Sequence, residues 1–484
     1  MAKPAFLTAM RHVGWAGIEV VSSVLVSLLA LLGIARLIGA TEFGLGVLAL
    51  GITQILGVVL GSLFHDALVR HPDLTRRHFD LAWTATLLLS IVACVICLII
   101  AEPLAHYFRE TRFVPVFLTL ALVLVPESLI APLIAERRRE LDFRLVTVQF
   151  LIARAVGALA GLVCAAFGLG VWSMVCQQWI TAVVGLIILL AKSPYRPRFA
   201  GAFADLLPML RFTSSIIATQ FVIQFAQRLL LIYIARIGDL TLAGYWGLAD
   251  RLIDAVQRTV TNALYHVSLS HFSKVQDDHR RLGELVRQAN IWFAGIVFPG
   301  LALICVAGPE IIRFLVGDGW GPAGPAVQVL ALGVMVQLRR LMDHVALNAL
   351  GRSDVALLAY GAEAALALLA LVAFGPVTLV AIALIRALQP IAGDVIIIAQ
   401  SIRLTERRVD TELLDVVRDL LFVVVITGAI WWLHHQVGAH HGVLYQLIAS
   451  TLGTLPVALA AFTLLRPALT ASLFSMAAER LRTQ

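Results

Sequence analysis

The chain has 484 residues, of which 60% are hydrophobic and only 14% are charged. Soluble proteins are nearer a quarter charged, so this composition excludes a soluble enzyme, a nucleic-acid-binding domain and a secreted disulfide scaffold. Apolar runs of about twenty residues recur from end to end and indicate an all-α polytopic membrane protein. The net charge of +7 is then attributed to basic cytoplasmic loops, and no nucleic-acid partner is expected.

The first apolar stretch follows Lys3 and Arg11 and at first sight has the form of a secretion signal. It is too long for one and lacks a small-residue cleavage site, so it predicts an uncleaved helix. It is the first of fourteen stretches that can cross about 30 Å of hydrocarbon. The predicted spans are approximately 14–36, 43–64, 81–101, 113–135, 146–168, 171–191, 213–235, 242–266, 288–308, 326–350, 354–374, 376–401, 419–437 and 443–465.

With residue 1 placed in the cytoplasm, the 37 basic residues separate strongly between the two sides. Twenty-five fall in the even-numbered loops and the termini, five fall on the opposite side, and seven fall inside spans. This asymmetry predicts that both termini are cytoplasmic. The loops are short and carry neither a nucleotide-binding nor a zinc-protease motif, so we expect no enzyme and no cofactor.

The two halves of the chain match at an offset of 200 residues. Residues 34–50 and 234–250 share seven identities in seventeen, including Arg36 with Arg236 and Thr41 with Thr241. Six spans per half is an even number, so the predicted repeats are parallel and enclose a cavity. We therefore predict a six-helix lobe over residues 1–200, a second over 201–405, and two additional helices with a cytoplasmic tail over 406–484.

Several motifs occur in an order and spacing that resemble a known family. They read ERRRELDFR from Glu136, then VGALAGLVCAAFGLGVWSMVCQQW, GYWGLADRL, FSKVQDDHRRL, VGDGWGPAGPAVQVLALG and NALGRSD. This set resembles the Wzx-like oligosaccharide flippases of the multidrug/oligosaccharidyl-lipid/polysaccharide (MOP) exporter superfamily.

The resemblance implies a MATE-like, V-shaped bundle of two lobes in the bacterial inner membrane. It also implies that polyprenyl-pyrophosphate-linked sugar repeat units move from the cytoplasmic to the periplasmic leaflet by alternating access, for exopolysaccharide or lipopolysaccharide biosynthesis. Membrane lipids, a proton or sodium gradient, and polysaccharide polymerase and assembly proteins are the further partners expected.

Ionisable residues inside the predicted spans are costly and are the candidate functional groups. Guanidinium groups suit pyrophosphate and acidic sugars, and the candidate substrate-binding residues are Arg228, Arg251, Arg258, Arg339, Arg340, Arg386 and Gln224. The candidate ion-coupling or gating residues are Asp250, Asp254, Asp343, His344 and Glu363. Helical spacing pairs Asp254 with Arg258, Arg339 with Asp343, and Arg340 with His344.

A second interpretation of these charges is that they form permanent pairs which only hold the second lobe together. Metal chemistry is not expected, because the motif formed by Cys94 and Cys97 lies in an apolar run without histidine nearby. The alternative functions are a MATE-type drug or cation antiporter and, less favoured, a membrane-embedded polysaccharide polymerase or ligase. The latter needs a sizeable loop with catalytic histidine or paired carboxylates, and the predicted loops offer none.

Overall fold

The computed structural model describes residues 3–62, 64, 68, 75–140, 142–193, 197–199, 220–221, 224–225, 227–375, 378–438 and 443–466. Side chains are described within these ranges from residue 26 onward, apart from residues 62, 143, 263, 266, 353, 437, 438, 443 and 444. Within these ranges the regular structure is entirely helical. The predicted all-α class is therefore confirmed. Parts of the predicted span 213–235, the side chains of Lys3 and Arg11, and the predicted tail after residue 466 lie outside the described residues.

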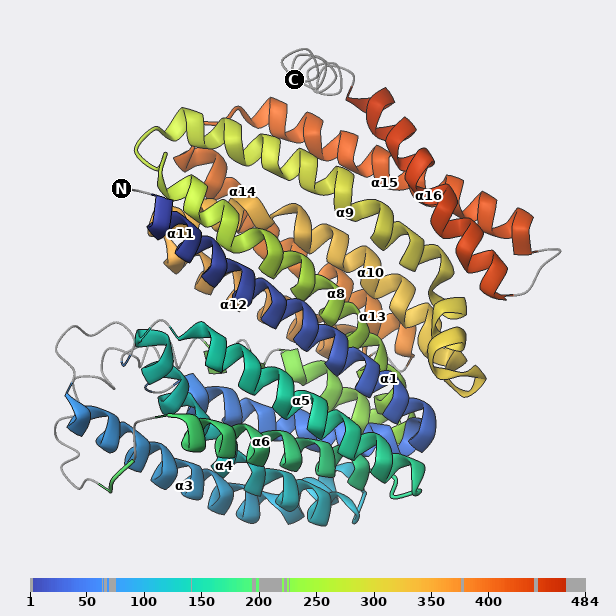
Figure 1. Cartoon of the computed structure of the whole chain (residues 1–484). Coiled ribbons are helices and arrows are strands. Elements are labelled where there is room, and N and C mark those ends of the chain that lie inside the picture. The colour runs from blue at the N-terminus through green and yellow to red at the C-terminus, as the bar shows by residue number, and fades with distance from the viewer. Residues whose placement is uncertain are drawn as a thin grey trace. The chain divides into compact units, whose positions relative to one another are not determined.

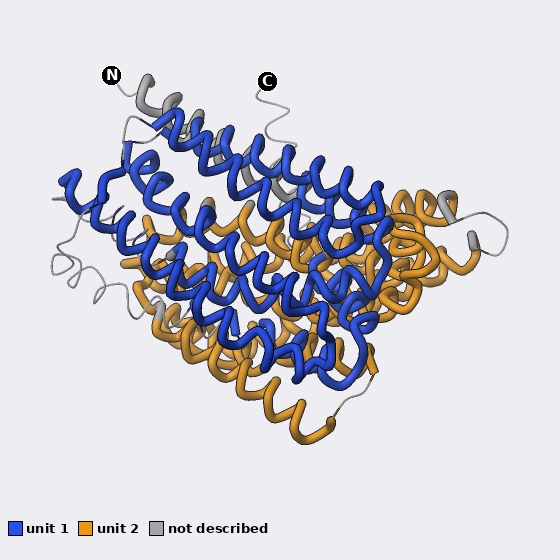
Figure 2. Tube along the Cα trace, turned by 90° about the horizontal axis from the view of Figure 1, so that it is seen from below, with its two compact units in different colours: residues 1–251 blue, residues 252–484 orange. Residues whose placement is uncertain are grey.

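The chain divides into two compact units, residues 1–251 and residues 252–484 (Figure 2). The predicted boundaries near residues 200 and 405 stay predictions.

The first unit is built on a long α1 and the helices that pack on it. α1 contacts α4 and α5, α5 contacts α6, and α3 contacts α4 (Figure 1). Its buried core includes Phe43, Phe113 and Phe117, the last two with stacked rings whose centroids are 5.0 Å apart. The bounds are α1 (Lys3–Ser62), α3 (Arg76–Phe108), α4 (Phe113–Arg139), α5 (Phe143–Ala166), α6 (Trp172–Lys192) and the start of α8 (Leu240–Ser273), preceded by helical residues 227–237.

The second unit contains the rest of α8 and the remaining helices. α9 contacts α10, α15 and α16, and α12 contacts α14 (Figure 1). The bounds are α9 (His279–Val316), η2 (Asp318–Ala323), α10 (Gly324–Arg339), α11 (Leu341–Ala349), α12 (Ser353–Phe374), α13 (Leu379–Leu388), α14 (Pro390–Leu404), α15 (Val409–Gly438) and α16 (Val443–Leu465).

Three features of the backbone differ from the predicted spans. The first two spans form one helix, α1, with a kink at Gly39, where φ is 78° and ψ is 169°. A side chain is disfavoured in that conformation, so a glycine marks the turn between the spans. The span predicted over 326–350 breaks at Arg340 into α10 and α11, and the span over 376–401 breaks before Pro390, which has no backbone N–H to continue α13.

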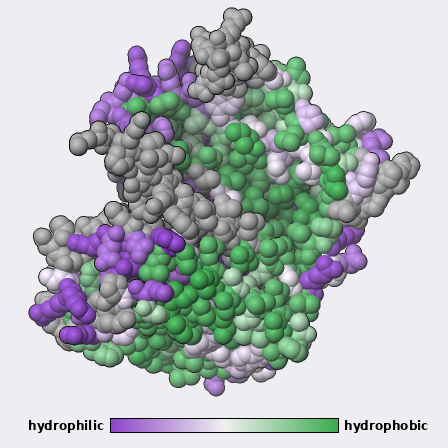
Figure 3. Space-filling model, viewed as in Figure 1, coloured by the Kyte–Doolittle hydropathy of each residue, from purple (hydrophilic) through white to green (hydrophobic). Residues whose placement is uncertain are grey.

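Large apolar side chains face outward along the helices. Leu98 and Ile99 of α3 are 60% and 69% exposed. Many large apolar side chains of α12 and α15 are exposed to a similar degree. On the face drawn in Figure 3, apolar residues cover the flanks of the helices and hydrophilic residues gather at the edges. Ten helices in the described part of the chain are long and apolar enough to cross a membrane. These ten helices confirm that the chain is a multi-pass membrane protein. The predicted number of fourteen membrane spans stays a prediction.

Candidate functional site

Arg228 lies in the first unit against the second half of α1. Its Nη2 donates a hydrogen bond of 2.9 Å to Oε1 of Gln54. Gly51, one turn earlier on α1, allows this close approach, because a Cβ there would lie 2.9 Å from Leu231 Cδ2 and 3.5 Å from Arg228 Cδ. The Nε of Arg228 is buried without a hydrogen-bond partner among the described residues. This guanidinium therefore retains a donor for another acceptor.

The ion pair predicted between Asp254 and Arg258 of α8 is present in the structure. Nε of Arg258 lies 2.7 Å from Oδ2 of Asp254, and the two side chains are 58% and 42% exposed. An ion pair that is this exposed is weak and can exchange partners. Asp250, Arg251 and Gln224 are half-buried, so this part of the chain presents accessible charged and amide groups from the predicted list.

Arg339, by contrast, is buried in a network of ion pairs within the second unit. It lies 2.6 Å from Glu412, 2.8 Å from Asp419 and, in the predicted pair, 3.9 Å from Asp343. Arg407 also pairs with Asp343 and lies 2.8 Å from Glu412. Asn290 of α9 donates a 2.8 Å hydrogen bond to the fully buried Asp343.

The network continues to the start of α15 and the end of α16. Arg466 lies 3.0 Å from Asp415 and 2.6 Å from Asp419, and Arg287 of α9 lies 2.5 Å from Asp415. Arg418 also lies 3.9 Å from Asp415, so five arginines face four carboxylates. The members are Arg287, Arg339, Arg407, Arg418 and Arg466 with Asp343, Glu412, Asp415 and Asp419.

Arg340 forms a second buried cluster at the break between α10 and α11. Its Nη1 lies 2.5 Å from Glu363 of α12 and 2.9 Å from Asp394 of α14, and donates to the carbonyl of Pro390 at 3.2 Å. Arg386 lies within electrostatic reach of Glu363, so two arginines offset the two carboxylates.

Helical spacing predicted that the side chains of Arg340 and His344 pair. This prediction is wrong, because the two side chains turn to different partners. The nitrogen Nε2 of the His344 ring instead lies 3.4 Å from Nδ2 of Asn348, and the ring lies between those of Tyr265 and Tyr360. The reason is that Arg340 turns toward α12 and α14, where the carboxylates are.

Sequence reasoning missed Arg407, Arg466 and the acidic face of α15. Glu412, Asp415 and Asp419 recur at spacings of three and four, so they share one face of a helix. That acidic stripe was the available signal for basic partners. Which basic residues those partners are depends on helices that lie far from α15 in the sequence.

The turn between the predicted first and second spans of each half forms a paired contact inside the first unit. The hydroxyl oxygens of Thr41 and Thr241 are 2.8 Å apart. A Cβ on Gly44 would lie 1.8 Å from the carbonyl oxygen of Leu240, and one on Gly244 would lie 2.0 Å from that of Ala40. Val47 likewise packs on Gly247. Residues separated by the repeat offset of 200 therefore touch one another, as a two-fold axis through this contact would require.

Glu42 ties the neighbouring turns to this contact. Its carboxylate lies 2.7 Å from Arg112 and accepts a 3.1 Å hydrogen bond from the backbone N–H of Val171 before α6. Arg112 also holds Glu110, and its hydrogen bonds lower the pKa of that carboxyl.

The helices and their exposed apolar flanks define a multi-pass membrane protein, and comparisons with known proteins give its family. Residues 34–325, more than half of the chain, match the family described as polysaccharide biosynthesis protein. The chain belongs to this family, and the predicted resemblance is confirmed.

Two relatives align with about two thirds of the chain. The succinoglycan biosynthesis transport protein ExoT of Rhizobium meliloti (strain 1021) is 25% identical over 330 residues, covering 67% of this chain and 66% of that protein. The lipopolysaccharide biosynthesis protein WzxC of Escherichia coli (strain K12) is 22% identical over 335 residues, covering 66% and 65%. The chain thus spans slightly less than two thirds of each relative's length.

Two solved structures share the fold. The lipid II flippase MurJ in an inward closed conformation aligns with a TM-score of 0.74 at 12% identity, over 93% of this chain and 99% of that one. An inward-facing multidrug resistance MATE family transporter of the MOP superfamily aligns with a TM-score of 0.55 at 15% identity, over 81% and 95%. The predicted MATE-like fold is confirmed, and the fold alone does not distinguish lipid-linked sugars from drugs.

Proposed function

We propose that this protein is a flippase for polyprenyl-pyrophosphate-linked sugar repeat units of an exopolysaccharide or lipopolysaccharide. The observation that carries the proposal is the match to the polysaccharide biosynthesis family over residues 34–325. Two relatives of the chain are named as a succinoglycan transport protein and a lipopolysaccharide biosynthesis protein, and the fold is shared with a lipid II flippase.

The candidates for pyrophosphate binding are arginines whose guanidinium groups are not fully occupied by carboxylates. Arg228 has an unused buried donor, and Arg258 is held only by an exposed pair with Asp254. Gln224, four residues before Arg228, and Arg251, on α8, are half-buried. Guanidinium forks bind phosphate oxygens in a bidentate manner, which favours arginine over lysine for this role.

Arg339, Arg340 and Arg386 were also predicted to bind substrate, and that prediction stays untested. The buried carboxylates around Arg339 and Arg340 favour the alternative interpretation, in which these arginines hold helices together. Asp343 and Glu363 belong to the same ion-pair clusters and are assigned the same structural role. Asp250 and Asp254 remain the candidates for ion coupling.

Transport proceeds by alternating access between two parallel repeats in the bacterial inner membrane, with both termini cytoplasmic. The paired contacts of Thr41 with Thr241 and of Gly44 with Gly244 support the repeat. The distribution of basic residues supports the orientation. A polymerase and assembly proteins act on the product on the periplasmic side.

Purified protein in vesicles tests the function directly. Lipid-linked repeat units from the producing strain are inserted, and membrane-impermeant periodate then oxidises only the sugars in the outer leaflet. We expect the protein to bring the protected, inner-leaflet sugars into reach of the oxidant, whereas protein-free vesicles keep them protected. An unchanged protected fraction, together with counter-transport of a cationic drug, would instead assign the chain to the antiporter class.

A further inference from the structure

Four uncharged polar side chains of the second unit meet on three helices and take no part in the ion-pair networks. Tyr265 of α8 accepts a 2.9 Å hydrogen bond at its hydroxyl from Nδ2 of Asn348 on α11. The ring of His344 has its centroid 6.5 Å from that of Tyr265 and 6.3 Å from that of Tyr360 on α12, the latter edge-on at 87°. All four side chains are half-buried.

The cluster keeps unused hydrogen-bonding capacity. Among the described residues, neither the Tyr360 hydroxyl nor Oδ1 of Asn348 has a hydrogen-bond partner. An amide oxygen accepts, whereas a phenol hydroxyl both donates and accepts. The tyrosine rings add apolar faces beside these polar atoms. A sugar ring has the matching chemistry, because it combines an apolar C–H face with hydroxyls around its rim.

The electrostatics favour a neutral ligand over an anion. The guanidinium of Arg340 lies 5.9 Å from the centroid of Tyr360. That charge is already matched by Glu363 and Asp394 at 2.5 and 2.9 Å. Because Glu363 and Asp394 already hold this guanidinium, the cluster suits hydroxyl groups better than pyrophosphate.

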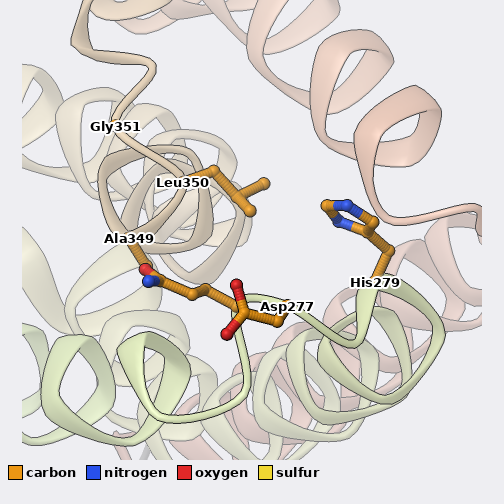
Figure 4. Close-up of a pocket in the computed structure, with 6 residues that line it drawn as sticks. Asp277, His279, Ala349, Leu350 and Gly351 are labelled. Atoms are coloured by element: carbon orange, nitrogen blue, oxygen red, sulfur yellow. The ribbon is translucent and has the colours of Figure 1, made fainter.

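A pocket opens where the same helices end. It has a volume of about 490 Å³ and is lined by Gln276, Asp277, His279, Ala349, Leu350 and Gly351 (Figure 4). Leu350 and the His279 ring face the space from opposite sides, and the Asp277 carboxylate lies below them (Figure 4). The volume is within the range of ligand pockets. Asn348 directly precedes Ala349, one of the residues that line this pocket.

We propose that Tyr265, His344, Asn348 and Tyr360 form a subsite for an uncharged sugar residue of the transported oligosaccharide. The pocket at the ends of α8 and α11 is its entrance, on the side predicted to be cytoplasmic. The subsite rests on the proposed flippase function. It assigns recognition of the sugar to α8, α11 and α12, separately from the arginines that bind pyrophosphate.

Two soluble probes separate the subsite from the pyrophosphate site in the purified full-length protein. One is the free oligosaccharide repeat unit, released from the polymer and carrying no phosphate, and the other is inorganic pyrophosphate. Tyr360→Ala should weaken binding of the oligosaccharide about tenfold, the effect of losing one aromatic contact with a hydroxyl. It should leave the affinity for pyrophosphate unchanged, whereas Arg258→Ala should show the reverse pattern.

Two milder variants protect the test against misfolding. Tyr360→Phe keeps the ring beside Arg340 and loses only the hydroxyl, and Asn348→Ala removes the amide that joins α8 to α11. Both should weaken binding of the oligosaccharide alone, whereas Tyr445→Phe, at an exposed position of α16, should bind both probes normally.

The outcomes also separate this inference from the proposed function. Wild-type flipping with unchanged oligosaccharide affinity in all three subsite variants would overturn the subsite and leave the flippase intact. Equal losses for both probes in folded variants would overturn it as well, because the residues would then not be selective for the sugar. Failure of the wild-type protein to flip lipid-linked repeat units would instead overturn the proposed function.

Discussion

Arg340 illustrates how burial decides the role of a single charge. One guanidinium nitrogen lies 2.5 Å from Glu363 and 2.9 Å from Asp394, and Gly393 leaves room for it, because a Cβ there would lie 2.4 Å from Nη1 of Arg340. Buried carboxylates without a partner are strongly destabilising. The residue therefore contributes to stability whatever it does during transport.

Arg340→Ala should lower the free energy of unfolding by about 3–5 kcal/mol, the typical cost of leaving buried charges unpaired. Arg258→Ala is the matched control, because its pair with Asp254 is exposed and should contribute at most about 1 kcal/mol. Thermal denaturation of both variants in detergent measures the difference. Equal stability of the two variants would contradict the structural role of Arg340.

Asp254→Asn tests whether the exposed pair on α8 couples substrate to protons. Pyrophosphate that binds Arg258 would compete with the carboxylate of Asp254 for the guanidinium, so the proposed coupling requires a carboxylate at this position. The variant cannot titrate, so we expect it to fold and to bind lipid-linked substrate but to flip it slowly, with little dependence on pH. Flipping rates in vesicles across a pH series provide the measurement, and a wild-type profile would reduce the pair to a structural contact.

At the scale of elements, the C-terminal helices α15 and α16 are joined to α9, α10 and α11 by the network of five arginines and four carboxylates. Arg466, directly after α16, lies 3.0 Å from Asp415 and 2.6 Å from Asp419. Apolar packing is not directional, whereas these pairs fix the position of α15 along α9. The two helices beyond the predicted repeats are therefore a rigidly attached part of the second unit.

Arg466→Ala should destabilise this unit by about 1.5–3 kcal/mol, because the buried Asp415 and Asp419 each lose one of their arginine partners. Hydrogen exchange should accelerate first in α15 and α16. The control is Arg408→Ala, since that side chain is 82% exposed and lies 3.9 Å from Asp410. Exchange that is unchanged in α15 and α16 would show that apolar packing alone holds these helices.

The contact between Thr41 and Thr241 offers a cross-link between the two repeats. In a background without the five native cysteines, Thr41→Cys with Thr241→Cys should oxidise readily, because the two hydroxyl oxygens are 2.8 Å apart. If the proposed alternating-access cycle separates the repeats at this contact, the disulfide should stop flipping and a reductant should restore it. Undiminished flipping by the oxidised pair would exclude separation at this point, and each single variant controls for the oxidant.

At the scale of the whole molecule, apolar exposure and basic loops together determine how the chain lies in a bilayer. The outward-facing residues of α3, α12 and α15 form surfaces that only lipid can cover. The basic residues then select which ends of the helices stay in the cytoplasm.

Single cysteines at positions 280 and 318 test this orientation, and both positions are exposed in the structure. A membrane-impermeant maleimide added to cells with a permeabilised outer membrane should label Asp318→Cys rapidly and leave Arg280→Cys protected until the inner membrane is disrupted. The opposite pattern would invert the topology and, with it, the proposed direction of transport.

The all-α membrane class and the family were predictable from the sequence, because apolar runs, turn glycines and basic loops act locally through hydration and backbone geometry, whereas the number of membrane-spanning helices stays a prediction. The sequence also predicted the pair of Asp254 with Arg258, since partners four residues apart share a helix face. The partners of the other side chains follow only from how the helices pack. Arg339 faces Glu412 and Asp419, and Arg407 pairs with Asp343. His344 lies beside Tyr265 and Tyr360. Helical periodicity states which face a charge occupies, but its partner depends on which distant helix packs against that face.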